Sequence, residues 1–162
     1  MGFLGTGVLA SGRLGSQVAA GISTAGLIVF QGFRLPLELL MHRAYTEGLM
    51  PVQMSFEGRN LDILTGAAAT AIGGVFLLRR RAVPRGLAWA FNLGGLALLL
   101  NIVVVAIASL PTFAAFGSGH LNVWVGDFPF VWLPTIFVML ALFGHLVLTR
   151  RLLAERRVAR DA

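Results

Sequence analysis

The stretch GLAWAFNLGGLALLLNIVVVAIASL, residues 86–110, decides the fold. It contains no charged side chain, and it exceeds the roughly 20 residues that an α-helix needs to cross the hydrocarbon core of a bilayer. An uncharged apolar run of this length is typical of a helix whose solvent is lipid. The stretch therefore predicts a transmembrane helix over about 86–110.

Three more apolar stretches flank this one, at about 18–45, 61–78 and 130–149. The 162 residues are 57% hydrophobic and only 12% charged, whereas an ordinary soluble domain has roughly 25% charged residues. We expect an all-α protein, a four-helix transmembrane bundle over residues 17–151. A Gly-rich lead-in, poorly ordered or interfacial, is expected at 1–16 and a basic tail at 152–162.

The arginines predict how the bundle is oriented. Of the 13 basic residues, all of them Arg, nine flank the same side of the predicted bundle: Arg79, Arg80, Arg81, Arg85, Arg150, Arg151, Arg156, Arg157 and Arg160. Basic residues in short loops near helix ends stay in the cytoplasm. Both termini are therefore expected inside, in a multi-pass protein of a plasma membrane. The basic tail is expected to lie against anionic lipid headgroups rather than nucleic acid, so the lipid bilayer is the predicted partner.

Missing residue types exclude several chemistries. The chain has no Lys, so a Schiff base with retinal or pyridoxal phosphate is excluded. It has no Cys, which excludes disulfides, thiolate metal sites and cysteine-held iron–sulfur clusters. The sequence indicates no particular cofactor. No internal repeat is visible, although a homodimer or a larger membrane complex would supply symmetry.

A stripe of polar side chains runs along the first predicted helix. Its members, spaced three or four residues apart, are Gln31, Arg34, Glu38, His42 and Tyr45. At 100° per residue they fall within an arc of about 80°, which is one face of a helix. Lipid contact would cost several kcal/mol per charge, so this face must meet protein or water. Arg34 and Glu38 can also neutralise each other at i, i+4. Two interpretations remain open: a seam that holds helices together, or a site for a ligand, an ion or a proton.

Further charged residues lie beyond the first helix, at the membrane edge. Combined with the stripe, they give a candidate ligand-binding cluster of Arg34, Glu38, His42, Glu57, Arg59 and Asp62. Secondary candidates are Gln31, Tyr45, Asn101 and His120. The pair Glu38 and His42 has a spacing that can share a metal ion, but a metal needs a third and a fourth ligand. A hydrogen-bonded histidine is the simpler interpretation.

Other polar and small residues predict helix packing. Gly66, Thr70 and Gly74 recur every four residues and predict a close helix–helix contact. Asn92 and Asn101 are expected to form interhelical hydrogen bonds, with Asn101 the better placed to reach the stripe. His145 is expected to snorkel or to cap a helix near the inner Arg cluster.

Three strings resemble those of an uncharacterised family of small bacterial polytopic membrane proteins. They are residues 33–38 (FRLPLE), 56–63 (FEGRNLDI) and 128–134 (FPFVWLP), and the resemblance covers roughly residues 30–149. The family has no established activity, so the resemblance implies no catalytic residues. It implies a multi-helix bundle in a bacterial inner membrane.

Three functions fit these observations. The favoured one is an outward-facing polar cluster that binds or transports a small ligand or ion. The second is a structural or accessory subunit whose polar seam only stabilises the bundle. The third is a membrane enzyme that uses Glu38 and His42 as acid and base on a lipid or a quinone. No nucleophile motif, phosphate loop or dinucleotide fingerprint accompanies those two residues, so an enzyme is the least favoured.

Overall fold

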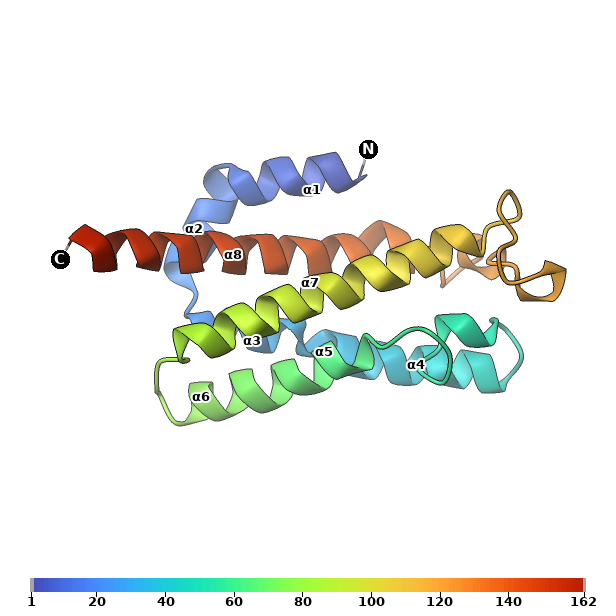
Figure 1. Cartoon of the computed structure of the whole chain (residues 1–162), viewed down its shortest axis with the longest axis horizontal. Coiled ribbons are helices and arrows are strands. Elements are labelled where there is room, and N and C mark those ends of the chain that lie inside the picture. The colour runs from blue at the N-terminus through green and yellow to red at the C-terminus, as the bar shows by residue number, and fades with distance from the viewer. Residues whose placement is uncertain (1, 162) are drawn as a thin grey trace.

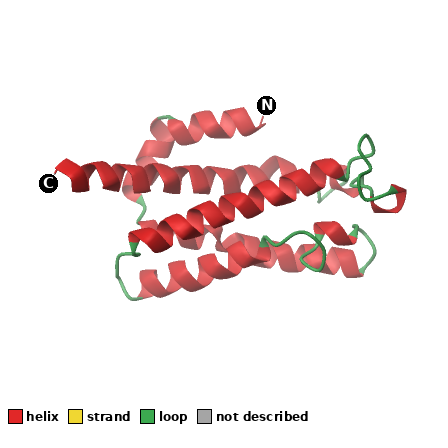
Figure 2. Cartoon of the chain, viewed as in Figure 1, coloured by secondary structure: helices red, strands yellow, loops and turns green. Residues whose placement is uncertain are grey.

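The computed structural model describes residues 2–161, with side chains up to residue 156, and every regular element within that part is helical (Figure 2). In chain order the longer elements are α1 (Gly2–Ser11), α2 (Arg13–Gly21), α3 (Thr24–Phe30), α4 (Arg34–Thr46), α5 (Ile63–Ala68), α6 (Gly74–Leu78), α7 (Arg85–Ala108) and α8 (Val138–Asp161). Short helical segments join them: η1 (Gln31–Phe33), η2 (Val52–Met54), η3 (Ala69–Gly73), η4 (Ser118–His120), η5 (Trp124–Gly126) and η6 (Leu133–Phe137). The expected all-α class is confirmed.

Three continuous helices are long and apolar enough to cross a membrane: Thr24–Thr46, Arg85–Ala108 and Leu133–Arg156. They correspond to the first, third and fourth predicted spans. The second predicted span forms a shorter apolar helix, Ile63–Leu78. At 1.5 Å per residue this helix is about 24 Å long, less than the roughly 30 Å of a bilayer core.

The helices run alongside one another in an elongated bundle (Figure 1). The connection from α6 to α7, which carries Arg79, Arg80 and Arg81, lies at the same end as the C-terminal end of α8. The long loop between α7 and η6 lies at the opposite end. The two Arg-rich segments therefore share one end of the bundle.

The surface of α7 is arranged for an apolar surrounding. Leu93 and Leu100 are 58% and 64% exposed, whereas the neighbouring Asn92 is completely buried. Water would favour the reverse order, with the leucines inside and the amide outside. Lipid contact removes the cost of exposing leucine and makes burial of the amide favourable. The pattern fits a helix packed in a membrane.

The Gly-rich start of the chain is helical and belongs to the bundle. The helix α1 packs along α8, and Gly2 approaches the side chain of Met139 near the start of that helix. Arg150 Nη1 donates to the carbonyl oxygens of Ala10, Ser11 and Gly12, at 3.1, 2.5 and 3.0 Å. Ala10 and Ser11 lie in the last turn of α1, where carbonyls lack intrahelical partners, so the guanidinium caps this helix. Within the described part of the chain, residues 2–16 of the expected lead-in thus pack in the bundle.

The predicted basic tail, 152–162, is helical as far as Asp161. The side chains of Arg157 and Arg160 lie outside the described part, so their expected contact with headgroups stays a prediction. Arg151, immediately before this tail, donates through Nη1 to the carbonyl oxygens of Ala19 and Ile22, at 2.6 and 2.8 Å. Arg150 and Arg151 therefore fasten the N-terminal helices to α8, a role that their membrane-edge position did not suggest.

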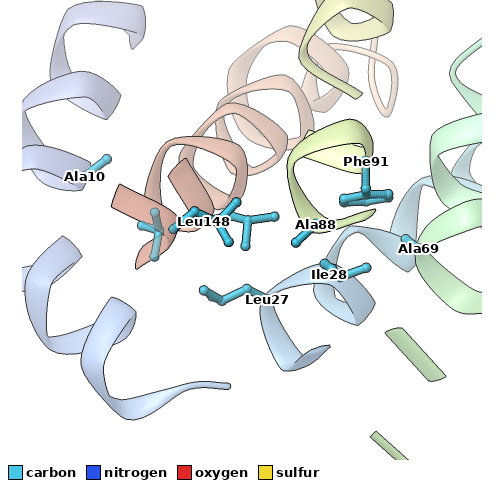
Figure 3. Packing of buried hydrophobic residues seen from close by; sticks show 9 residues of the cluster. Ala10, Leu27, Ile28, Ala69, Ala88, Phe91 and Leu148 are labelled. Carbon is cyan, nitrogen blue, oxygen red and sulfur yellow. The ribbon is translucent and has the colours of Figure 1, made fainter. Parts of the chain in front are cut away.

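Small side chains let five elements meet in one hydrophobic cluster (Figure 3). Leu27 and Ile28 of α3 pack against Leu148 of α8, and Ala69 and Ala88 close the cluster from η3 and α7. Ala10 adds the end of α1. The cluster fixes α3 against α8 and thereby sets the positions of Arg34, which follows α3 in the chain, and of His145, which precedes Leu148 on α8.

The close contact between helices 24–46 and 63–78 uses Gly66, as expected, but Gly73 in place of Gly74. A Cβ at Gly66 would collide with the backbone of Leu35, and one at Gly73 with the backbone of Val29. Gly74, predicted to lie in this contact, faces open space. Gly73 thus takes the place in the contact that the four-residue spacing assigned to Gly74.

Candidate functional site

The segment between α4 and α5 turns inward along α4 instead of staying at the end of the bundle (Figure 1). Its backbone is irregular, but Ser55 and Asn60 are completely buried within the protein. Irregular backbone at membrane depth is tolerated where protein covers it. As a result Asp62, expected at the membrane edge, lies beside Arg34 in the middle of the structure.

Arg34 and Asp62 form a buried ion pair. Arg34 Nε donates to Asp62 Oδ2 at 2.6 Å, and Arg34 Nη2 donates to Asp62 Oδ1. The two residues are 1% and 5% exposed. Arg34 was expected to pair with Glu38 at i, i+4, but Asp62 takes that place because it offers two oxygens to the planar guanidinium fork.

A hydrogen-bonded chain continues from Arg34 into α7 and α8. Arg34 Nη1 lies 3.1 Å from His145 Nε2, and His145 Nδ1 lies 3.0 Å from Asn92 Oδ1. A guanidinium only donates, so Nε2 must accept and Nδ1–H must donate to Asn92. Asn92 Nδ2 in turn donates to Thr149 Oγ1 at 2.7 Å. The neutral tautomer of His145 thus links the Arg34–Asp62 pair to two more helices.

Two glycines leave room for this chain. A Cβ on Gly95 in α7 would collide with the imidazole of His145, and a Cβ on Gly144 in α8 would collide with the side-chain amide of Gln31. Gln31 Nε2 donates to the carbonyl oxygen of Ala141 at 2.9 Å. Close backbone approach at both glycines lets the polar side chains cross between helices.

Glu38 lies one turn beyond Arg34 and has a separate partner. Asn60 Nδ2 donates to Glu38 Oε2 at 2.8 Å and to the carbonyl oxygen of Met54 at 3.0 Å. The other oxygen, Oε1, receives no hydrogen bond from any residue in the described part of the chain. Glu38 therefore retains one acceptor for a further donor.

A cavity of about 200 Å³ opens over this polar group. Its floor contains Arg34, Glu38, Asn60 and Asp62. Its walls are apolar and come from α4, α7, η6 and α8, with Phe3 of α1 at the rim. Wall residues such as Ile107 and Phe3 are about half exposed, so the cavity reaches the outer surface of the bundle.

Trp124 also lines the cavity, from the loop that follows α7. It is 7% exposed and packs edge-on against Phe130, with ring centroids 4.9 Å apart. Its indole Nε1 is buried without a hydrogen-bond partner among residues 2–156. A buried donor without a partner costs about 1–3 kcal/mol, so this N–H needs an acceptor that the described residues do not provide.

His42 and Glu57 form a second, more exposed group near the end of α4. His42 Nδ1 lies 3.3 Å from Ser55 Oγ, and Nε2 lies 3.6 Å from Glu57 Oε1. The imidazole stacks on Phe56, with ring centroids 4.3 Å apart. His42 does not line the cavity, so Glu38 and His42 do not face one space. Within residues 2–156, no three His, Cys, Asp or Glu side chains are grouped closely enough to hold a metal ion.

The remaining candidates are dispersed. The Arg59 guanidinium lies over the Phe116 ring, 5.2 Å from its centroid, and is exposed. Asn101 Nδ2 donates to the Arg59 carbonyl oxygen at 2.7 Å and does not reach the stripe. Tyr45 packs beside His42, and His120 is exposed. The candidate cluster thus divides into Arg34, Glu38 and Asp62 around the cavity, His42 and Glu57 beside it, and Arg59 apart.

Sequence reasoning missed three residues of the site: Asn92, Trp124 and His145. His145 was placed near the Arg cluster because Arg150 follows five residues later, but it is completely buried at the centre of the polar chain. An ionisable residue within an apolar run is a site candidate by default, and that signal was present. Nothing in the sequence indicates that the N–H of Trp124 lacks a hydrogen-bond partner.

No family model, curated protein or solved structure matches the chain. Over the described residues, the structure defines an all-helical protein with three helices of membrane length and a buried polar group that lines an apolar cavity.

Proposed function

We propose that this chain is an integral membrane protein that binds a small membrane-soluble ligand in the cavity above Glu38. The observation that carries the proposal is the cavity itself, about 200 Å³ of apolar-walled space ending on a polar floor. Ligand sites are typically concave and mostly apolar with a few convergent polar groups. Glu38, whose Oε1 accepts no hydrogen bond within the described part of the chain, is one such group.

The proposed topology has four crossings of a bacterial inner membrane. The second crossing combines the inward-turned segment before α5 with the helix 63–78, which together join the two ends of the bundle. The end that carries Arg79–Arg85 and Arg150 faces the cytoplasm, in keeping with the positive-inside rule. The cavity then lies in the outer half of the bilayer, beneath the loop that carries Trp124.

Ligand binding is tested by cavity filling. Ala106 lines the cavity, so Ala106→Phe should fill it, while Ala108→Phe two residues later adds the same bulk outside it. A ligand that binds only the folded state raises its stability in proportion to ln(1 + [L]/Kd). Adding a lipid extract of the expression host to delipidated protein should raise the melting temperature of wild type and Ala108→Phe by several degrees. Equal responses of all three proteins would contradict the proposal.

A structural subunit is the second candidate, and the pairing of the charges favours it. Arg34, Asp62, His145 and Asn92 satisfy one another across helices without any ligand. Buried charges in membranes often hold helices together in this way. This function predicts that Ala106→Phe leaves the effect of added lipid unchanged, so the experiment above separates the two candidates.

A further inference from the structure

A second cavity, of about 480 Å³, lies at the Arg-rich end of the bundle, opposite the loop that carries Trp124 (Figure 1). Its lining comes from the start of α3, the end of α6, the loop that follows α6, and α8. The volume falls within the roughly 300–1,000 Å³ of small-molecule sites. Arg80, Arg81 and Arg151 are among the lining residues, so the cavity suits an anion.

The positive charge of two of these arginines is uncompensated. Glu155, which also lines the cavity, pairs with Arg151 at 3.0 Å. None of the ion pairs among the described residues includes Arg80 or Arg81, and both are exposed. A guanidinium group can donate two parallel hydrogen bonds to the oxygens of a phosphate group. Two such groups beside one cavity favour a phosphate as the anion.

The backbone fixes these two arginines at the end of α6. Arg80 N–H donates to the Leu77 carbonyl oxygen, and Arg81 N–H donates to the Phe76 carbonyl oxygen, each at 3.1 Å. This pair of bonds forms the Schellman motif, whose left-handed residue is usually glycine. Here that residue is Arg80, at φ 50°. A side chain in this conformation lowers stability, and strain of this kind clusters at functional sites.

We propose that this cavity binds the phosphodiester group of an anionic phospholipid. The proposal goes beyond the ligand above Glu38, because it concerns a different cavity at the other end of the bundle. Basic pockets between helices on the cytoplasmic side of a membrane bind the headgroups of anionic lipids. Phe76 and Leu77 also line the cavity, and the adjoining Leu78 is 86% exposed. The acyl chains of a lipid would pack along this apolar surface, whereas a free phosphate would gain nothing from it.

The binding test titrates delipidated protein in detergent with phosphatidylglycerol or phosphatidylcholine and measures the first bound lipid by native mass spectrometry. Wild type should bind phosphatidylglycerol at least about tenfold more tightly, since only this lipid carries a net negative charge. Arg80→Gln/Arg81→Gln should lose about thirtyfold in affinity for phosphatidylglycerol, the value of two arginines near a headgroup. The matched control Arg79→Gln/Arg85→Gln removes the same charge from either side of the pair, outside the lining, and should lose less than about threefold.

A further variant separates lipid binding from folding. Arg80→Gly supplies the residue that the left-handed position favours, so it should raise the melting temperature in detergent alone. It also removes one arginine from the cavity and should weaken phosphatidylglycerol binding by about fivefold. A stabilised Arg80→Gly variant that binds this lipid as tightly as wild type would contradict the proposal.

Three other outcomes would overturn the lipid site. Equal losses of affinity in the two double variants would show that general charge attraction holds the lipid, and equal affinity of wild type for both lipids would show that its charge is not recognised. Inorganic phosphate that displaces phosphatidylglycerol with the same affinity would make the free anion the ligand. Ala106→Phe fills the other cavity and should leave the affinity for phosphatidylglycerol unchanged, so the test does not depend on the ligand above Glu38.

Discussion

At the scale of single residues, the buried pair Arg34–Asp62 joins two parts of the molecule that the sequence separates by 28 positions. The polar stripe on the first helix could be predicted from spacing alone, because charges three and four residues apart share a helix face. The partner of Arg34 could not be predicted. Asp62 is charged and follows Asn60, so it resembles a helix cap at the membrane edge, and only the inward turn of the preceding segment brings it to Arg34.

This pair gives a stability prediction. Asp62→Leu leaves the Arg34 guanidinium buried without its counter-charge and should lower the free energy of unfolding by about 3–5 kcal/mol. The double variant Arg34→Met/Asp62→Leu removes both charges and should recover most of the loss. Unfolding of the detergent-solubilised proteins by SDS measures both. A double variant no more stable than the single one would show that the charge pairing is not what matters here.

At the scale of elements, four apolar segments could be located from the sequence because uninterrupted hydrophobicity marks a helix in lipid. Two features of these elements differ from what the sequence predicted. The helix α1 (Gly2–Ser11) is held by Arg150 from the far end of the chain, and a Gly-rich segment gives no sign of such a cap. The contact face includes Gly73 rather than Gly74, although the four-residue spacing of Gly66, Thr70 and Gly74 singled out Gly74.

The glycine contact gives a second prediction, with a control on the same helix. Gly66→Ala places a methyl group against the backbone of Leu35, so it should destabilise the protein by about 1–3 kcal/mol, as overpacked sites do. Gly74→Ala meets open space and should be neutral or stabilising by up to about 1 kcal/mol, since alanine is the better helix former. Thermal unfolding in one detergent compares the two. Similar losses of stability in both variants would contradict the position of Gly74 outside the helix contact.

At the scale of the whole molecule, the Arg distribution predicts orientation, and the structure places both Arg-rich segments at one end of the bundle. The grouping of the six candidate residues was harder to foresee. They are neighbours in sequence or share one helix face, but the cavity selects only those that point between α4, α7 and α8. That choice depends on how the helices pack against one another, which hydrophobic patterning leaves undetermined.

The absence of cysteine makes the proposed topology directly testable. Ala82→Cys introduces a thiol into the loop before α7, and Ser118→Cys introduces one into the loop after it; both sites are exposed. In intact cells stripped of the outer membrane, a membrane-impermeant maleimide should label position 118 but label position 82 only after permeabilisation. Labelling of both thiols without permeabilisation would place both loops on the same side of the membrane and contradict the proposed topology.

The most direct test of the central claim, that the cavity is a ligand site, is native mass spectrometry of the protein released from nanodiscs. Wild type and Ala108→Phe should each carry an additional mass that survives release, and its value identifies the class of ligand. Ala106→Phe should lack that mass while retaining the helical circular dichroism spectrum. Wild type without any bound mass, or Ala106→Phe with the same bound mass, would contradict the claim.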